Sequence, residues 1–325
     1  KITFYRNCIV EHLVIARKDE KMYLFSVIIP HYNSVLSLNK LIDSIPVDPS
    51  IQLIIVDDKS SEDLSEVETM VRARNGIFLP NKTEKKGAGT CRNLGLSQAT
   101  GKWLVFADAD DYFLNGAFDI MMRHIDSEAD IIHFIPTSID LRTGKASNRH
   151  SWCEKLVRRY LADPTVEENG QMLRYRYMVP WSKMIRNQMV QDFGIRFDEV
   201  MVSNDIMFSA KCGYCAKKID AFADKIYCVT RADGTLTTRH DEDLCRIRAI
   251  VFKEKYTFLA EQVNFKKYGC VKPMEIHFLY NVFRQGYSLK FLCELHRLFR
   301  QAKIPLINAA YIIYAFRHLI KEKGF

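Results

Sequence analysis

The sequence has little that would hold a protein in a membrane or carry it across one. It contains no run of the roughly twenty apolar residues that a bilayer-spanning helix needs. Charges interrupt the apolar residues at its start, where a signal peptide has an apolar core. Nine cysteines are scattered without the paired spacing of a disulfide framework in a chain of 325 residues. We therefore expect reduced thiols and a cytoplasmic protein.

Other familiar signatures are missing as well. The chain has no internal repeat, no glycine-rich linker and no G-x-x-x-x-G-K-[ST] phosphate loop. Cys212 and Cys215 form a C-x-x-C pair, but no second pair lies at the spacing of a zinc finger. Two small residues one helical turn apart are the simpler interpretation of this pair.

The composition is that of a globular protein with a large core, because 48% of the residues are hydrophobic and 26% are charged. The formal net charge of +8 favours an anionic partner, which could be a nucleotide, a nucleic acid or an anionic membrane surface. Aromatic residues do not interleave with a basic stripe, so we expect no nucleic acid.

Short apolar runs alternate with amphipathic stretches, and each run ends in turn-forming or acidic residues. The expected strands are LFSVIIPHYN (24–33), IQLIIVDD (51–58), GIFLPN (76–81), KWLVFADADD (102–111), DIIHFIP (130–136) and KIYCVTR (225–231). Helices should follow the first two strands, the second capped by Ser60 or Ser61, and GAGTCRNLGLSQATG (87–101) should open a third. The alternation predicts an α/β fold with a mainly parallel central sheet, flanked by helices, whose ligands gather beyond the carboxyl ends of the strands.

Two clusters of acids follow expected strands. Asp57 and Asp58 end the second strand, and Asp108, Asp110 and Asp111 end the fourth. Like charges this close repel one another unless water or a cation screens them. Because residues two apart on a strand point to one face, we expect Asp108 and Asp110 to approach one cation together.

Five segments, in this order, resemble the successive landmarks of family 2 glycosyltransferases of the GT-A fold. They are VIIPHYN, IIVDDKSSED, KGAGTCRNLGLSQATGKWLVFADADD, VPWSKMIR and SNDIMF. Five motifs in the right order are more specific than any one of them. The resemblance implies a Rossmann-like GT-A enzyme that uses a nucleotide-sugar donor, of the type that builds bacterial capsule, O-antigen and other surface polysaccharides. The Q-x-x-R-W motif of processive membrane synthases is absent.

The resemblance also implies a metal site. Asp110 would bind Mn²⁺ or Mg²⁺ directly, Asp108 would lie against the metal or the ribose, and Asp111 would orient the site. A divalent cation held by such carboxylates neutralises the charge that grows on a departing diphosphate. Taken alone, a D-x-D-D after a strand is also compatible with solvated turn acids.

A UDP-sugar donor site is implied by nine positions. They are Pro30, Tyr32, Asn33, Asp57, Asp58, Lys86, Gly87, Arg92 and Asp108. A rigid proline and an aromatic face suit a flat base, a carboxylate can accept the N3–H of uracil, and glycines with cations suit a diphosphate. His31 has no counterpart in the family, and we expect it in a loop.

Inverting transfer needs a general base for the acceptor hydroxyl, and Asp205 matches that position. Asn204 stands where relatives usually carry Glu, and the loss of that like charge would lower the pKa of the base, other things being equal. Either residue could instead be the N-cap of the helix that follows. Trp181 and Lys183 match a W-x-K that would contact the sugar and an anion, with a buried structural tryptophan as the alternative.

The segment RADGTLTTRH (231–240) resembles the mobile segment after the last strand of the family. Arg231, Arg239 or His240 could contact the diphosphate there, and His240 could complete the metal shell.

We expect three parts along the chain. Residues 1–21 are an N-terminal extension to which we assign no function. Residues 22–240 form the GT-A domain, with a nucleotide-binding part at about 22–115 and an acceptor part at about 116–240. Residues 241–325 are helical, apolar and basic, and the stretch 304–320 could lie on an anionic membrane surface or pack as a terminal helix. The acceptor would be a glycan or a lipid-linked saccharide.

Two rival functions stay open at this stage. A sugar-nucleotide nucleotidyltransferase also places carboxylates beyond a nucleotide-binding sheet, but it usually carries a glycine-rich and basic signature after the first strand, which IIPHYNSVLS lacks. A catalytically silent GT-A-like binding module is the other rival.

Overall fold

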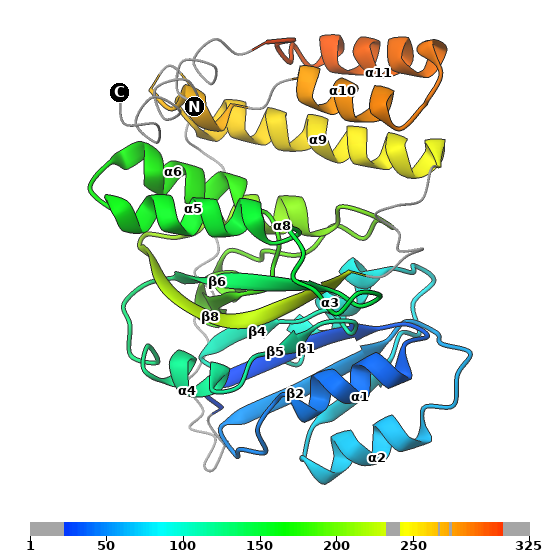
Figure 1. The fold of residues 1–325 in the computed structure, drawn as a ribbon, viewed down its shortest axis with the longest axis vertical. Helices are drawn as coiled ribbons and strands as arrows, with labels where there is room; N and C mark the ends of the chain where they lie inside the picture. The colour runs from blue at the N-terminus through cyan, green and yellow to red at the C-terminus, as the bar shows by residue number, and fades with distance from the viewer. Residues whose placement is uncertain (1–22, 232–240, 266, 273–274, 308–325) are drawn as a thin grey trace, which may run out of the picture.

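The structure is a computed structural model that describes residues 23–231, 241–265, 267–272 and 275–307. In this part of the chain a sheet of eight strands crosses the molecule, helices lie on either side of it, and a further group of helices lies at one end (Figure 1). The predictions for residues 1–21, for Arg239 and His240, and for most of the stretch 304–320 concern residues outside the described ranges.

The strand order in the sheet is β3-β2-β1-β4-β7-β6-β8-β5. The strands are β1 (Phe25–His31), β2 (Ile51–Asp57), β3 (Ile77–Pro80), β4 (Trp103–Phe106), β5 (Tyr112–Phe113), β6 (Ile131–Asp140), β7 (Lys183–Arg186) and β8 (Ile219–Arg231). The first four strands are mutually parallel, and β6 is parallel to β8, while β7 and β5 are antiparallel to their neighbours. The predicted α/β fold is confirmed, as a mixed sheet whose N-terminal half is parallel.

Eleven α-helices accompany the sheet in the described residues. They are α1 (Val35–Asp43), α2 (Ser65–Ala73), α3 (Ala88–Leu96), α4 (Ala117–Met122), α5 (Ser151–Ala162), α6 (Glu167–Arg176), α7 (Asn187–Asp192), α8 (Asp205–Cys215), α9 (Glu242–Gln262), α10 (Glu275–Arg284) and α11 (Leu289–Gln301), with a 3₁₀ turn η1 (Gly269–Val271). Cys212 and Cys215 lie one turn apart in α8, as the simpler interpretation of that pair predicts.

The core explains why the acids gather at one edge. Side chains of β1, β2 and β4 are buried almost throughout, as expected for parallel strands covered on both faces. His31 pairs with Asp57 in the register of β1 and β2, and Ile28 pairs with Phe106 in that of β1 and β4. The carboxyl ends of the three strands therefore lie together.

Two local predictions are wrong. Strand β4 ends at Phe106, so Asp108 and Asp110 follow it in a loop and a turn, and strand alternation does not orient them. Helix α2 begins at Ser65, after Leu64 at its N-cap, so neither preceding serine at 60–61 caps it. The strand ends earlier, and the helix begins later, than the local pattern indicates.

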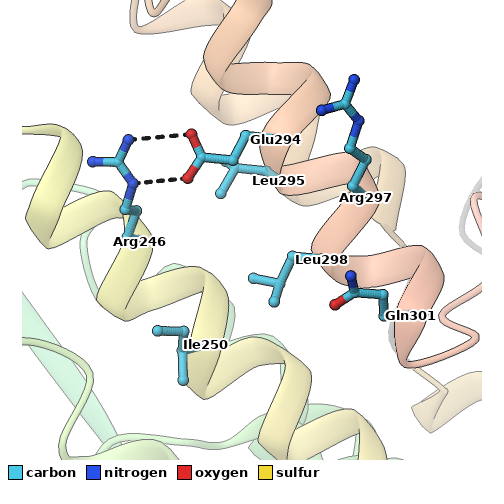
Figure 2. Close-up of a pocket in the computed structure, with 7 residues that line it drawn as sticks. All are labelled: Arg246, Ile250, Glu294, Leu295, Arg297, Leu298 and Gln301. Atoms are coloured by element: carbon cyan, nitrogen blue, oxygen red, sulfur yellow. Dashed lines mark hydrogen bonds and ion pairs between the residues drawn. The ribbon is translucent and has the colours of Figure 1, made fainter.

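The expected helical C-terminal region is present as α9, α10 and α11 (Figure 1). Helix α9 packs on α8, and a second apolar cluster, with Phe291, Leu295 and Phe299 at its centre, holds the three helices together. Figure 2 shows Arg246 of α9 and Glu294 of α11 joined by two parallel hydrogen bonds of 2.9 and 3.2 Å above a hollow of about 330 Å³. No described helix is long and apolar enough to cross a bilayer.

Lys255 of α9 generates a stability prediction, because burial and then the charge of Arg176 lower its pKa to about 7. A lysine in an unfolded chain has a pKa of about 10.4. Between about pH 7 and that value the unfolded chain therefore carries one more proton than the folded protein, and the free energy of unfolding of the wild type rises with pH. Lys255→Met should be the more stable protein below about pH 7, by a few kcal/mol, and should lose that advantage towards about pH 10.

Urea unfolding across this pH range measures the difference between variant and wild type. Lys253→Met, less buried on the same helix, is the control and should show a nearly constant difference. Parallel stability curves for wild type and Lys255→Met would contradict the prediction.

Candidate functional site

The carboxyl ends of β1, β2 and β4 meet the first residues of α3 and α8, and the predicted site residues gather there. Hydrogen bonds and ring contacts connect Tyr32, Asn33, Asp57, Asp58, Lys86, Gly87, Arg92, Asp108, Asp110, Asp111 and Asn204 to this edge. Pro30 lies in β1 itself, and Asp205 directly follows Asn204 as the first residue of α8. The chain therefore brings residues from about 30 to 205 into one site.

Asp57 is held from two sides. Nδ1 of His31 lies 3.0 Å from its Oδ1, and the backbone N–H of Ser60 donates to its Oδ2 over 3.0 Å. The N–H of Ser34 donates to Nε2 of His31 over 3.2 Å, so a neutral ring carries its proton on Nδ1 and donates it to Asp57. The expectation that His31 is a loop residue is wrong, because it is the buried last residue of β1.

Asp58 anchors the glycine segment that precedes α3. The side-chain amide of Asn81 donates to Oδ1 over 2.8 Å, and the N–H of Gly87 donates to Oδ2 over 2.7 Å. Gly87 has φ +119°, a conformation open mainly to glycine. Sequence reasoning missed Asn81, which lies one residue past β3 at the same edge of the sheet.

Tyr32 and Lys86 form an exposed contact beside these acids. The Tyr32 side chain is exposed, and Nζ of Lys86 lies 4.4 Å from the centre of its ring. Asn33 adopts φ 45°, and its Oδ1 accepts from the N–H of Ser61 over 2.8 Å, which fixes the turn after β1. An aromatic face and an ammonium group thus lie together where the resemblance implies a nucleotide.

Arg92 of α3 joins two parts of the site that are far apart in sequence. Its Nη2 donates to Oδ1 of Asp108 over 2.5 Å, and its Nη1 donates to Oδ1 of Asn204 over 2.7 Å. The guanidinium is buried and lies 5.2 Å from the ring centre of Phe197. Asn204 occupies the N-cap position of α8, but its side chain makes no cap hydrogen bond and binds Arg92 instead.

The three acids after β4 have different surroundings. Asp108 and Asp110 are partly buried, whereas Asp111 is buried and its Oδ1 accepts from the N–H of Thr230 over 2.7 Å. Burial and then the charge of Asp108 raise the pKa of Asp110. Burial, with Asp110 and Asp108 adding to it, raises the pKa of Asp111 well above its usual range. The hydroxyl of Tyr227 accepts from the N–H of Asp108 over 2.9 Å.

This donor set fits a divalent cation. Two partly exposed carboxylates, Asp108 and Asp110, offer the oxygen ligands that Mg²⁺ and Mn²⁺ prefer. Burial and then the charge of Asp108 disfavour a negative charge on Asp110, which a cation would balance. Within the described ranges no group of three or more His, Cys, Asp or Glu residues is arranged to hold a metal ion. The remaining ligands would come from the donor, from water or from residues such as His240 that lie outside those ranges.

Asp205 is partly buried at the start of α8. Burial raises the pKa of its carboxyl group, the charge of Arg92 opposes the rise and that of Asp108 adds to it. The prediction that Asn204 gives a lower pKa than Glu would, other things being equal, stays a prediction, and burial is the first cause of the raised pKa. A carboxylate with a raised pKa is the stronger base.

Trp181 and Lys183 lie behind the site. Trp181 is buried and stacks on Tyr227 with ring centres 5.8 Å apart. Lys183 is also buried, its Nζ donates to the backbone oxygen of Tyr177 over 2.7 Å, and burial lowers its pKa to about 8. Their burial favours the structural alternative, and a contact with sugar or anion stays a prediction.

Sequence reasoning also missed residues on the far side of the acids. Thr230 and Tyr227 of β8 contact the D-x-D-D segment, and the Thr230 hydroxyl donates to the backbone oxygen of Asp110 over 2.7 Å. Arg149, in the loop after β6, donates from Nη1 to the backbone oxygen of Thr230 over 2.9 Å. No local signal marks these residues, because only the pairing of β6, β8 and β5 brings them to the acids. Arg231 is exposed at the end of β8.

The fold is that of the GT-A glycosyltransferases. The chain belongs to glycosyl transferase family 2, whose family model matches residues 26–193. Recognition of the family from its five segments is thereby confirmed.

Curated proteins similar to this chain are glycosyltransferases by name. The poly(ribitol-phosphate) beta-N-acetylglucosaminyltransferase TarS of Staphylococcus aureus (strain Mu50) is 25% identical over 212 residues, which are 63% of this chain and 35% of TarS. The GalNAc(5)-diNAcBac-PP-undecaprenol beta-1,3-glucosyltransferase of Campylobacter jejuni is 35% identical over 102 residues, 30% of this chain and 33% of that protein. The chain spans about a third of the length of these curated relatives.

Two solved structures show the fold. Residues 1–349 of S. aureus TarS in complex with UDP-GlcNAc superpose with a TM-score of 0.64 at 22% identity, covering 86% of this chain and 81% of that one. The mannosyltransferase PcManGT of Pyrobaculum calidifontis, in complex with GDP-Man and Mn²⁺, has a TM-score of 0.50 at 14% identity and covers 92% of this chain and 81% of its own.

The approach of α3 to the loop before α8 generates a second stability prediction. A Cβ added to Gly89 would lie 2.1 Å from the backbone oxygen of Asp198 and 2.9 Å from Cβ of Asn204. Gly89→Ala must therefore displace that loop, and we expect it to lower the free energy of unfolding by about 1–3 kcal/mol, as overpacking does.

Gly170→Ala in α6 is the matched control, because its added Cβ would meet only Cε2 of Tyr160, at 3.9 Å. Alanine should stabilise that helix by up to about 1 kcal/mol. Equal effects of the two substitutions in urea unfolding would contradict the packing argument.

Proposed function

We propose that the protein is an inverting, metal-dependent glycosyltransferase that moves a sugar from a UDP-sugar to a glycan or lipid-linked glycan acceptor in the biosynthesis of surface polysaccharides. One observation carries the proposal: within a family 2 fold, Arg92 connects the acids after β4 with the residue before Asp205. The residue next to the candidate base and an acid of the candidate diphosphate site thereby accept hydrogen bonds from one guanidinium.

The nucleotide is assigned to the edge formed by β1, β2 and the glycine segment. Pro30, Tyr32 and Asn33 would lie beside the base, Asp57 and Asp58 would accept hydrogen bonds from base or ribose, and Lys86 and Gly87 would face the diphosphate. The bound UDP and UDP-GlcNAc named for the TarS structures support a uridine nucleotide.

Asp110 and Asp108 would hold Mn²⁺ or Mg²⁺. When bound, the cation balances negative charge that develops on the departing diphosphate. The Mn²⁺ named for the PcManGT structure supports this choice of cofactor. Asp111, whose pKa is raised by burial and whose Oδ1 accepts from the N–H of Thr230, would keep the preceding acids in place.

The transfer step uses Asp205 as the base. The acceptor oxygen attacks the anomeric carbon from the face opposite the diphosphate, its bond to that carbon forms, and the bond from the anomeric carbon to the diphosphate oxygen breaks. UDP leaves with the electron pair, and the proton of the acceptor hydroxyl passes to the Asp205 carboxylate. The buried surroundings that raise the pKa of Asp205 make it better suited to take this proton near neutral pH.

Asp110→Ala tests the assignment of the diphosphate site. The variant loses a carboxylate that would hold the cation, so we expect calorimetry to show no Mn²⁺-dependent binding of UDP. Asp126→Ala, which removes an exposed aspartate paired with Lys102 away from the site, should bind like wild type. Retained metal-dependent binding by Asp110→Ala would place the metal elsewhere, and a wild type that binds no nucleotide would favour a silent module.

Asp205→Asn tests the base. We expect UDP to bind with unchanged affinity and turnover to fall by about 10²–10⁴-fold, the usual contribution of a general base. In the wild type, kcat should fall as pH drops through the raised pKa of Asp205, at a higher pH than an exposed aspartate would give. Near-normal turnover by the variant, measured as UDP released in the presence of acceptor, would refute the assignment.

A further inference from the structure

A tight hairpin follows β6 and folds back on the end of that strand. The N–H of Asp140 donates to the backbone oxygen of Lys145 over 2.9 Å, and the N–H of Ser147 donates to that of Ser138 over 2.9 Å. Ile139 and Ala146 pair as an antiparallel bridge. Residues 141–150 are therefore held against the sheet, beside the end of β8, where the N–H of Leu141 donates to the backbone oxygen of Arg231 over 3.0 Å.

Polar side chains fix the C-terminal end of this hairpin. Nδ1 of His150 lies 2.7 Å from Oγ of Ser138, and its Nε2 lies 3.2 Å from Oε2 of Glu154. The order Ser, His, Glu is that of a hydrolase triad, but the Ser138 hydroxyl is buried and lies 2.9 Å from the backbone oxygen of Ser147, to which it donates. The network therefore has a structural role, and its hydrogen bonds hold the residues on both sides of Arg149 in place.

Arg149 extends from this anchored segment to the acids. Its guanidinium donates to the backbone oxygen of Thr230, whose own N–H and hydroxyl donate to Asp111 Oδ1 and to the backbone oxygen of Asp110. The Arg149 side chain is exposed, in contrast to the buried Arg92. A guanidinium has five N–H donors, so one bond to Thr230 positions it and leaves donors for a ligand.

The positive charge of Arg149 acts on the carboxyl group of Asp110. Burial and the charge of Asp108 raise the pKa of Asp110, and the positive charge of Arg149 opposes them. Arg92 donates to Asp108 and Asn204, inside the protein. Arg149 is thus an exposed cation next to acids where negative charge would develop during transfer, and a planar guanidinium suits two phosphate oxygens at once.

We propose that Arg149 binds a phosphate group of the reactants beside Asp110 and so determines which phosphate-bearing reactant the enzyme uses. The proposal rests on the transferase function proposed above. The phosphate has two sources with the same chemistry, the diphosphate of the UDP donor and a phosphate carried by the acceptor. The experiment separates them.

Three variants are compared with wild type: Arg149→Gln, Arg149→Lys and the control Lys145→Gln. Lys145 is exposed on the same hairpin, so its loss changes net charge equally without removing the guanidinium at Thr230. Calorimetry measures Mn²⁺-dependent binding of UDP and binding of uridine. Kinetics measure KM and kcat with a polyol-phosphate oligomer and with the same polyol lacking phosphate.

If the donor supplies the phosphate, Arg149→Gln should weaken UDP binding by about tenfold and leave uridine binding unchanged. If the acceptor supplies it, UDP binding should be unchanged, while KM for the phosphate-bearing acceptor rises by about tenfold, with kcat and the phosphate-free acceptor little affected. In either case Arg149→Lys should recover part of the loss, because it keeps the charge without the planar fork.

Two results would overturn the inference while the proposed function stands: an active Arg149→Gln enzyme with wild-type UDP binding and wild-type KM, or an equal loss in Lys145→Gln, which would mean a general effect of charge. A wild-type protein that neither binds UDP nor transfers sugar would overturn the proposed function and this inference together.

Discussion

The site depends on one buried cation, Arg92. It comes from a helix that begins directly after a glycine segment, and it reaches a carboxylate beyond β4 and an amide before α8 at once. A buried guanidinium without acceptors would cost far more than its two hydrogen bonds contribute, so the three elements are fixed relative to one another. Gly89 makes this possible, because any side chain there would meet the backbone oxygen of Asp198.

The neutral residue at 204 follows from the same constraint. Arg92 already has Asp108 as its ion-pair partner, so an amide oxygen can accept from its Nη1 without placing a second negative charge next to Asp205. The carboxyl group of Asp205 nevertheless has a raised pKa, because its burial outweighs the nearby cation. Burial is thus the first cause of the raised pKa at this position, and burial is a property of the fold that the local sequence does not reveal.

Local pattern was enough to predict six of the eight strands and both acid clusters, because each of these apolar runs has a clear end and the acids follow two of them. The short strands β5 and β7 were not predicted. It failed at His31, a polar residue whose burial depends on the register of β1 against β2. It also failed at Ser60, which binds Asp57 and Asn33 instead of capping a helix. Thr230 and Tyr227 lie far from the acids in sequence, and the antiparallel pairing of β5, which follows the acids, with β8 brings them there.

The three acids after β4 differ in how the protein balances their charges. Asp111 turns inward and is buried against β8, and Asp108 is balanced by Arg92. Among the described residues Asp110 has no ion-pair partner. The positive charge of Arg149 only partly opposes the rise in the pKa of Asp110 that burial and Asp108 cause. The carboxylate of Asp110, at the edge of the sheet, is therefore the least balanced of the three, because Asp108 pairs with Arg92 and Asp111 accepts a hydrogen bond from Thr230. A cluster balanced in this way would still attract a cation, as the proposed function requires.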